Sequence, residues 1–149
     1  EGLRAAGFTR LSFGVQTFND RILKLIDRTH TADEARAAVS AARAAGFDNV
    51  SFDLMFGLPR QTLAEWDRTL EAAFALGVPH LSMYGLTVEE GTPFWARRER
   101  GRLTLPGEGL QASMFARAME RAAAAGYVRY EISNHARPGY ACRHNQIYW

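Results

Sequence analysis

The sequence predicts an α/β fold in which parallel strands alternate with outer helices. One observation is a signal that occurs four times, a helix tail closed by glycine and followed by a β-rich run, with the tails ending at Phe8, Phe47, Val78 and Tyr127. Glycine takes the left-handed helix cap without steric cost, so each tail marks the end of a helix. The other observation is that the β-rich runs are apolar on one face only. Strands that alternate with helices form βαβ units and a parallel sheet.

Four β-rich runs are the predicted strands: RLSFGVQ at 10–16, NVSFDLMFGLP at 49–59, HLSMYGLT at 80–87 and VRYEISN at 128–134. The first three align on a shared serine, which is Ser12, Ser51 or Ser82. Side chains alternate across a strand, so the residues between these serines form a separate, apolar face that must lie under the helices. The opposite face is polar.

Helices are expected between these strands. Thr31 with Glu34 and Thr62 with Glu65 fit the capping box, in which hydroxyl and carboxylate satisfy free backbone donors. Apolar residues then recur at helical spacing, at Ala35, Ala38, Ala42 and Ala45, and at Leu63, Trp66, Leu70 and Phe74. A further helix is predicted over about 108–125, after a long connection over 88–107.

The polar face of the sheet predicts where a ligand binds. A complete (β/α)₈ barrel has roughly 250 residues and an interior filled by bulky branched side chains. Here the same face carries serine, glycine, aspartate and glutamine. This pattern indicates an open or partial (β/α) barrel that holds a ligand at the carboxyl ends of its strands. The alternative is a flat doubly wound sheet whose polar residues satisfy one another.

Composition narrows the class of protein. The 149 residues, 47% of them hydrophobic, are enough for one core. No apolar run reaches the roughly 18 residues that a membrane span needs, and the net charge of +2 includes no basic cluster typical of nucleic-acid binding. The single cysteine, Cys142, forms no internal disulfide and cannot alone hold an iron-sulfur cluster. We therefore expect a cytoplasmic location. Because the sequence starts inside a predicted helix and stops just after an apparent motif, we also expect the chain to be part of a longer protein.

Three polar residues of the predicted sheet and its loops are candidates for ligand binding. Asp53 lies inside a strand, where an unpaired buried carboxylate costs several kcal/mol, so ligand hydroxyls or Arg28 would have to supply donors. A structural carboxylate that caps a loop is equally compatible. Gln16 ends its strand, and its amide suits a ribose or an amino acid head group. The planar guanidinium of Arg28 can pair with a carboxylate through two hydrogen bonds. The same sequence pattern also fits a surface arginine at the C-terminus of a helix.

The end of the chain, ARPGYACRHNQIYW, is a candidate haem site. His144 and Tyr148 are four residues apart and would share one face of a helix. Imidazole binds haem iron, and Trp149 could pack against a flat macrocycle. No CxxCH motif is present, so covalent haem attachment is not supported. Spacing alone favours a histidine whose hydrogen bonds are satisfied beside aromatic core residues.

Five blocks of sequence, taken in order, resemble one family. They are RLSFGVQTFND, RTHT, SFDLMFGLPRQT, GTPF and YEISNHARPGYACRHNQIYW. Together they resemble the radical S-adenosylmethionine proteins related to oxygen-independent coproporphyrinogen III oxidase. The last block resembles the haem-chaperone branch, with its HNxxYW motif at His144, Asn145, Tyr148 and Trp149. The resemblance implies that residues 1–149 are the C-terminal part of a radical SAM partial (β/α) barrel.

The resemblance also implies cofactors and the residues that bind them. Gln16, Arg28, Asp53 and Thr87 match family positions that contact S-adenosylmethionine. Asp53 would accept hydrogen bonds from ribose or amino groups, and Arg28 would pair with the methionine carboxylate. His144 matches the histidine that the haem-chaperone branch uses towards haem, while the role of Cys142 stays open.

One departure from the family bears on activity. The CxxxCxxC loop that holds a 4Fe-4S cluster is absent from this sequence, so the cluster ligands are expected outside this chain. This chain alone is therefore expected to be inactive as an enzyme. The function implied is that of a haem chaperone that passes haem to an acceptor protein whose identity is open. The alternative is oxidative decarboxylation of coproporphyrinogen III, which removes carbon dioxide from propionate side chains.

A third hypothesis, from a different functional class, is that the protein is a barrel hydrolase or lyase with Asp53 as general base. It would need a nucleophile or a metal partner. The histidines are scattered at positions 30, 80, 135 and 144 and offer no such group.

Overall fold

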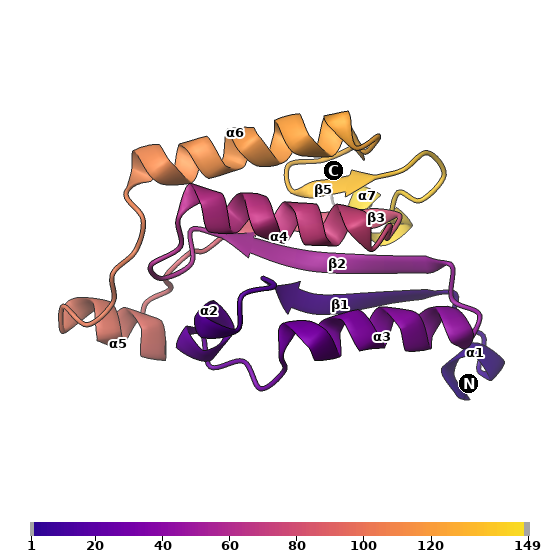
Figure 1. Ribbon diagram of the computed structural model, residues 1–149, viewed down its shortest axis with the longest axis horizontal. Helices are drawn as coiled ribbons and strands as arrows, with labels where there is room; N and C mark the ends of the chain where they lie inside the picture. The colour runs from indigo at the N-terminus through magenta and orange to yellow at the C-terminus, as the bar shows by residue number, and fades with distance from the viewer. Residues whose placement is uncertain (1, 148–149) are drawn as a thin grey trace.

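The computed structural model describes residues 2–147 as one five-stranded mixed sheet against which the three longest helices pack (Figure 1). Its strands run in the order β1-β2-β3-β5-β4. Their bounds are β1 Arg10–Gln16, β2 Asn49–Phe56, β3 His80–Gly85, β4 Val128–Arg129 and β5 Asn134–Ala136. The strands β1, β2 and β3 are parallel, which confirms the predicted α/β class and is compatible with a partial (β/α) barrel.

Seven helices lie in the described part of the chain. Their bounds are α1 Gly2–Ala5, α2 Asp20–Leu25, α3 Ala32–Ala44, α4 Leu63–Ala75, α5 Pro93–Glu99, α6 Glu108–Ala124 and α7 Arg143–Gln146. Both predicted capping boxes form, at Thr31 with Glu34 before α3 and at Thr62 with Glu65 before α4. The predicted helix over about 108–125 is α6. The long connection before it contains α5, which was not predicted.

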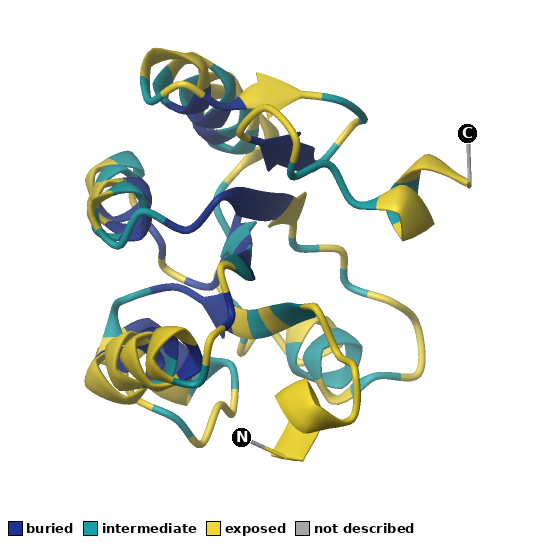
Figure 2. Cartoon of the chain, turned by 90° about the vertical axis from the view of Figure 1, so that its right-hand side faces the viewer, coloured by how far each residue is buried: buried dark blue, intermediate teal, exposed yellow. Residues whose placement is uncertain are grey.

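The hydrophobic core lies between the sheet and the helices α3, α4 and α6. Figure 2 shows these helices on one side of the sheet, with their buried sides turned towards it. The strand residues predicted to face the helices pack into this core, including Val50, Phe52, Leu54, Leu81 and Met83. From α4, Trp66 is fully buried and its Nε1 donates a hydrogen bond to the Met114 carbonyl of α6 at 2.9 Å. These contacts leave the other face of β1, β2 and β3 without a covering layer of helices, and we call it the open face.

The fourth predicted strand folds differently from the first three. The run over 128–134 was expected to add another parallel strand, but it forms one arm and the turn of a hairpin in which β4 pairs with β5 antiparallel. In turn, β5 pairs with β3 antiparallel. The reversal occurs at Glu131, whose side chain accepts a hydrogen bond from the Ser133 backbone N–H at 3.0 Å. Such a local bond stabilises a turn in place of a continuous strand.

The register of β3 also differs from the alignment on serine. The structure pairs Ser12 with Ser51, and Ser51 with His80 rather than with Ser82. Ser82 instead lies beside Asp53. A shift of two residues keeps every side chain on the same face, so the predicted division into an apolar and a polar face is retained.

Candidate functional site

The open face carries Asp53 in its middle row. Asp53 lies on β2, is half-buried, and its Oδ1 accepts a hydrogen bond from the Ser12 hydroxyl of β1 at 3.1 Å. The donor expected from sequence was a ligand or Arg28, and the structure supplies Ser12. One hydrogen bond uses only part of the capacity of a carboxylate, which has about four acceptor positions. Asp53 therefore retains room to accept hydrogen bonds from a ligand.

Gln16 ends β1 in an uncommon backbone conformation. Its φ is 64°, in the left-handed region that non-glycine residues rarely adopt. The pairing of β1 with β2 is irregular between Phe13 and Gln16, where β1 contains one extra residue. This bulge directs the Gln16 side chain towards Gly14, because a β-carbon on Gly14 would lie 3.0 Å from Nε2 of Gln16. Gly14 and Asp53 follow the paired residues Phe13 and Phe52, so the Gln16 amide beside Gly14 lies next to the row of Asp53.

The amide of Gln16 is a polar group available to a ligand. Gln16 is 6% exposed as a residue, and within residues 2–147 its amide makes no hydrogen bond. The amide atoms are not among the fully buried atoms that lack a partner in this part of the chain, so they still reach solvent. Strained backbone is found preferentially at functional sites, and the backbone of Gln16 fits a residue that is held in place for a ligand.

Arg28 lies outside this pair, on the exposed loop between α2 and α3. Figure 1 shows this loop beyond the arrowhead of β1, at the carboxyl ends of the strands. The preceding residue, Asp27, forms an ion pair with Arg97 of α5 at 2.8 Å, which ties the loop to α5. Arg28 itself forms no ion pair within the described residues. The loop that carries Arg28 is therefore at the carboxyl ends of the strands, and within the described residues no hydrogen bond or ion pair links Arg28 to Asp53.

Thr87 follows the end of β3 and is exposed. The neighbouring Leu86 N–H donates to the Phe56 carbonyl of β2 at 2.9 Å, which holds this segment against the end of β2. At Gly85 a β-carbon would lie 3.2 Å from the Phe56 ring. The absence of a side chain at Gly85 lets the chain leave the sheet there, so that Thr87 borders the same carboxyl end as Gln16.

A second polar group occupies the amino end of the open face. It centres on His80, the first residue of β3, which is fully buried. Its Nδ1 lies 2.7 Å from the Ser51 hydroxyl, and its Nε2 lies 2.7 Å from the Tyr130 hydroxyl. Burial lowers the pKa of His80 to about 4, with smaller contributions from the charges of Arg10 and His135. The imidazole is therefore neutral at ordinary pH.

The same Tyr130 hydroxyl holds α7 and the segment before it. The Cys142 backbone N–H donates to the Tyr130 oxygen at 3.2 Å, and the Asn145 side-chain amide donates to it at 3.3 Å. His144, between these two residues, is exposed at the surface. The predicted motif partners Tyr148 and Trp149 lie outside the described residues. Cys142 is half-buried and acts here through its backbone.

The predicted site residues thus fall at two ends of one face. Gln16, Asp53 and Thr87 lie towards the carboxyl ends of the strands, whereas α7 with His144 is tied to the amino end of β3. Gln16 pairs with Leu54 of β2, three residues along from Ser51, which lies in the row of His80. At about 3.3 Å a residue this is a separation of roughly 10 Å along the sheet. A ligand bound through His144 and one bound through Gln16 would therefore occupy different places.

Two residues of the second group were missed by the sequence analysis. His80 was counted only among the scattered histidines, and Tyr130 only as part of a predicted strand. The alternation of β3 already places His80 on the same face as Ser82, and this was the available signal. The partnership with Tyr130 required the hairpin of β4 and β5, which the sequence analysis did not predict.

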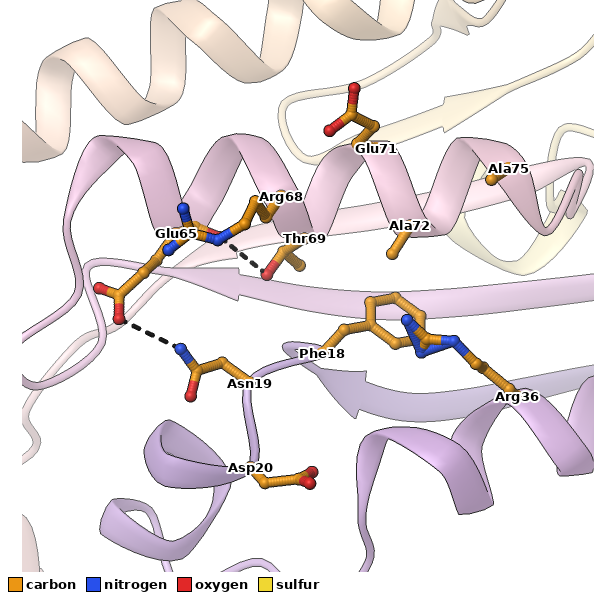
Figure 3. A pocket seen from close by; sticks show the side chains of 10 residues that line it. All are labelled: Phe18, Asn19, Asp20, Arg36, Glu65, Arg68, Thr69, Glu71, Ala72 and Ala75. Atoms are coloured by element: carbon orange, nitrogen blue, oxygen red, sulfur yellow. Dashed lines mark hydrogen bonds between the residues drawn. The ribbon is translucent and has the colours of Figure 1, made fainter.

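A cavity of about 580 Å³ lies on the other side of the sheet, between α3 and α4 (Figure 3). Arg36 stacks over the Phe18 ring there, 4.9 Å from its centroid. The polar groups satisfy one another, as Asn19 donates to Glu65 at 3.1 Å and Thr69 donates to the Glu65 carbonyl. This cavity is separate from the open face and has no buried polar group awaiting a partner.

Within residues 2–147 no cluster of three or more histidine, cysteine or acidic side chains could hold a metal ion. The one cysteine of the sequence supplies at most one thiolate, so the residues of this chain do not fit an iron-sulfur cluster, which needs several. The same residues include no helix with the length and hydropathy needed to cross a membrane.

Comparison with known proteins gives consistent matches. Residues 1–73 match the Radical SAM superfamily. The chain is 44% identical over 147 residues to a protein of Bacillus subtilis named "Heme chaperone HemW", and 41% identical over 144 residues to the protein of that name in Escherichia coli. These alignments cover 99% and 97% of this chain but only 39% and 37% of the relatives, so the chain spans about two fifths of their length.

The fold is similar to that of a solved enzyme. The structure superposes on coproporphyrinogen III oxidase, HemN, from Escherichia coli, a radical SAM enzyme, with a TM-score of 0.79 and 29% sequence identity. The match covers 92% of this chain and 31% of that enzyme.

Proposed function

Because this chain belongs to the radical SAM superfamily and to its HemW-related group, we propose that it is the carboxyl-terminal part of a haem chaperone's partial barrel. In this proposal the full-length protein is cytoplasmic, binds haem and passes it to an acceptor protein. The main support is the similarity to proteins named as haem chaperones over nearly the whole chain. The exposed position of His144, on a segment held to the barrel by hydrogen bonds, is compatible with a haem ligand.

We propose further that the carboxyl end of the open face binds S-adenosylmethionine. The Gln16 amide would hydrogen-bond the ligand, Asp53 would accept hydrogen bonds from its ribose or amino group, and Thr87 would border it. Arg28 would pair with the methionine carboxylate after a movement of its exposed loop. When bound with a 4Fe-4S cluster held outside this chain, adenosylmethionine supplies one-electron chemistry to proteins of this superfamily.

The test is a titration of the full-length protein with ferric haem, followed by the Soret absorbance. Wild-type protein should bind one haem saturably, and His144→Ala should weaken binding at least tenfold. Gln146→Ala is the matched control, because Gln146 is exposed on the same short helix and should leave affinity unchanged. Equal affinity in wild type and His144→Ala would remove His144 from the proposal, and absence of binding by wild type would overturn the chaperone function.

A second candidate is the decarboxylation of coproporphyrinogen III. The specific observation in its favour is the structural similarity to the solved oxidase. An anaerobic assay with the reconstituted full-length protein distinguishes the two, because the oxidase converts propionate groups to vinyl groups and releases carbon dioxide. Turnover of coproporphyrinogen without haem binding would replace the chaperone proposal with this one.

A further inference from the structure

We propose that Tyr130 is the positioning residue that holds the His144 segment in a binding-competent place on the barrel. The inference rests on the proposed haem function and concerns the same site. Tyr130 itself touches no haem in this proposal. It acts through its hydroxyl, which joins the segment 142–147 to His80 of β3.

The hydrogen bonds of Tyr130 have only one consistent direction. Its oxygen accepts from the Cys142 backbone N–H at 3.2 Å and from the Asn145 amide at 3.3 Å, and neither donor can act as acceptor in these bonds. Two accepted bonds occupy both lone pairs of the hydroxyl. The single proton of Tyr130 must therefore be donated to Nε2 of His80, 2.7 Å away.

This direction fixes the tautomer of His80. Since Nε2 accepts a hydrogen bond from the Tyr130 hydroxyl, the ring hydrogen resides on Nδ1, which then donates to the Ser51 hydroxyl at 2.7 Å. The network thus runs from the segment 142–147 through Tyr130 and His80 to Ser51 of β2. Tyr130 is therefore held through His80 of β3 and, through His80, by Ser51 of β2.

The side chains of this segment are mostly exposed. Residues 143, 144, 146 and 147 are exposed, and Ile147 is 80% exposed. Figure 2 shows α7 away from the helical layer, on the opposite side of the sheet. A short exposed helix has little packing energy of its own, because helical stability in proteins comes mainly from burial of one face. Loss of the two hydrogen bonds to Tyr130 should therefore loosen the segment while the core stays intact.

Tyr130→Phe removes the hydroxyl and keeps the ring, which lies 5.7 Å from the His80 ring. Tyr140→Phe is the matched control, because Tyr140 is partly buried near the same segment and its hydroxyl makes no hydrogen bond within the described residues. In the full-length protein, Tyr130→Phe should bind haem about tenfold more weakly and shift the Soret maximum. Tyr140→Phe should resemble wild type.

A double-mutant cycle separates positioning from general destabilisation. Asn145→Ala removes one donor to the Tyr130 oxygen from the exposed side of the network. If both residues act through the same bond, the double variant with Tyr130→Phe should lose no more affinity than Tyr130→Phe alone. If the fold losses of haem affinity in the two single variants multiply in the double variant, the two residues act independently, and the inference is overturned. His80→Gln retains an acceptor for Tyr130 and should keep most of the affinity, whereas His80→Leu should lose it.

Hydrogen exchange of the protein without haem distinguishes the possible failures. The Cys142 amide should exchange about tenfold faster in Tyr130→Phe, whether or not haem binds. Unchanged exchange would overturn the anchoring role. Faster exchange combined with wild-type haem affinity would overturn the positioning role alone. Absence of haem binding by the wild-type protein would instead overturn the proposed function, and with it any role of Tyr130 in haem binding.

Discussion

The side-chain amide of Gln16 lies directly beside Gly14, 3.0 Å from the place where a β-carbon of Gly14 would stand. The bulge at the end of β1 and the positive φ of Gln16 produce this arrangement. A glycine inside a strand normally weakens it, and here it makes room for a polar side chain on the open face. The relationship gives the first prediction.

Gly14→Ala should displace the Gln16 amide and weaken S-adenosylmethionine binding by about tenfold. The displaced group is the end of a flexible side chain, so the free energy of unfolding should change by less than about 1 kcal/mol. Isothermal titration calorimetry of the reconstituted full-length protein measures the affinity. Gly109→Ala is the control, because Gly109 lies in α6 with open space around it. Equal affinity in wild type and Gly14→Ala would show that Gln16 does not contact the ligand.

Asp53→Asn should reduce the affinity for S-adenosylmethionine at least tenfold. The substitution keeps the size of the side chain but replaces one acceptor oxygen with a donor, so bonds from ribose or amino groups are lost. Ser12→Ala serves as the comparison, because it removes only the hydroxyl that donates to Asp53. Ser12→Ala should reduce the affinity for S-adenosylmethionine by about threefold or less. A larger effect for Ser12→Ala than for Asp53→Asn would assign Asp53 a structural role instead.

Stability should decrease as the pH falls from about 6.5 to about 4. Burial lowers the pKa of folded His80 from 6.5 to about 4, so in this window the unfolded state binds a proton that the folded state does not. The loss from His80 should reach about 3 kcal/mol at pH 4, and above pH 6.5 His80 contributes no pH dependence. Burial lowers the pKa of His135 as well, which adds a change in the same direction.

Urea-induced unfolding at pH 7.5 and pH 5 measures this effect. His80→Gln should show a smaller loss of stability between the two values than wild type. The carboxylates that titrate in this range are common to both proteins. The difference between their losses of stability therefore arises from His80. Identical losses in both proteins would mean that His80 is not neutral in the folded state at pH 5.

Trp66→Phe should lower the free energy of unfolding by about 1 to 3 kcal/mol. The ring of Trp66 is fully buried between α4 and the core, and its Nε1 donates to the Met114 carbonyl. Replacement by the smaller phenylalanine removes that hydrogen bond and leaves a small cavity. Trp95→Phe is the control on the partly exposed α5 and should cost less than about 1 kcal/mol. Comparable losses from both substitutions would contradict the central place of Trp66 in the core.

The first three strands, the main helices and the two faces of the sheet could be predicted from the sequence. Glycine caps, capping boxes and the alternation of apolar residues are local signals, and each one acts within a few residues of chain. For the same reason the region from residue 128 was predicted incorrectly. A β-rich run specifies extended chain but not its partner, and the turn at Glu131 reversed its direction.

The sequence by itself determined which side chains share the open face, because alternation along a strand sets the face of every residue. Only the tertiary structure decided the register, which pairs Ser51 with His80, and the bulge that directs Gln16 towards Gly14. It also decided that the His144 segment is tied to the amino end of β3, through Tyr130, rather than to the carboxyl ends. These features include a hydrogen bond between residues 50 positions apart, and hydrogen bonds over such separations depend on how the elements pack, which no local pattern contains.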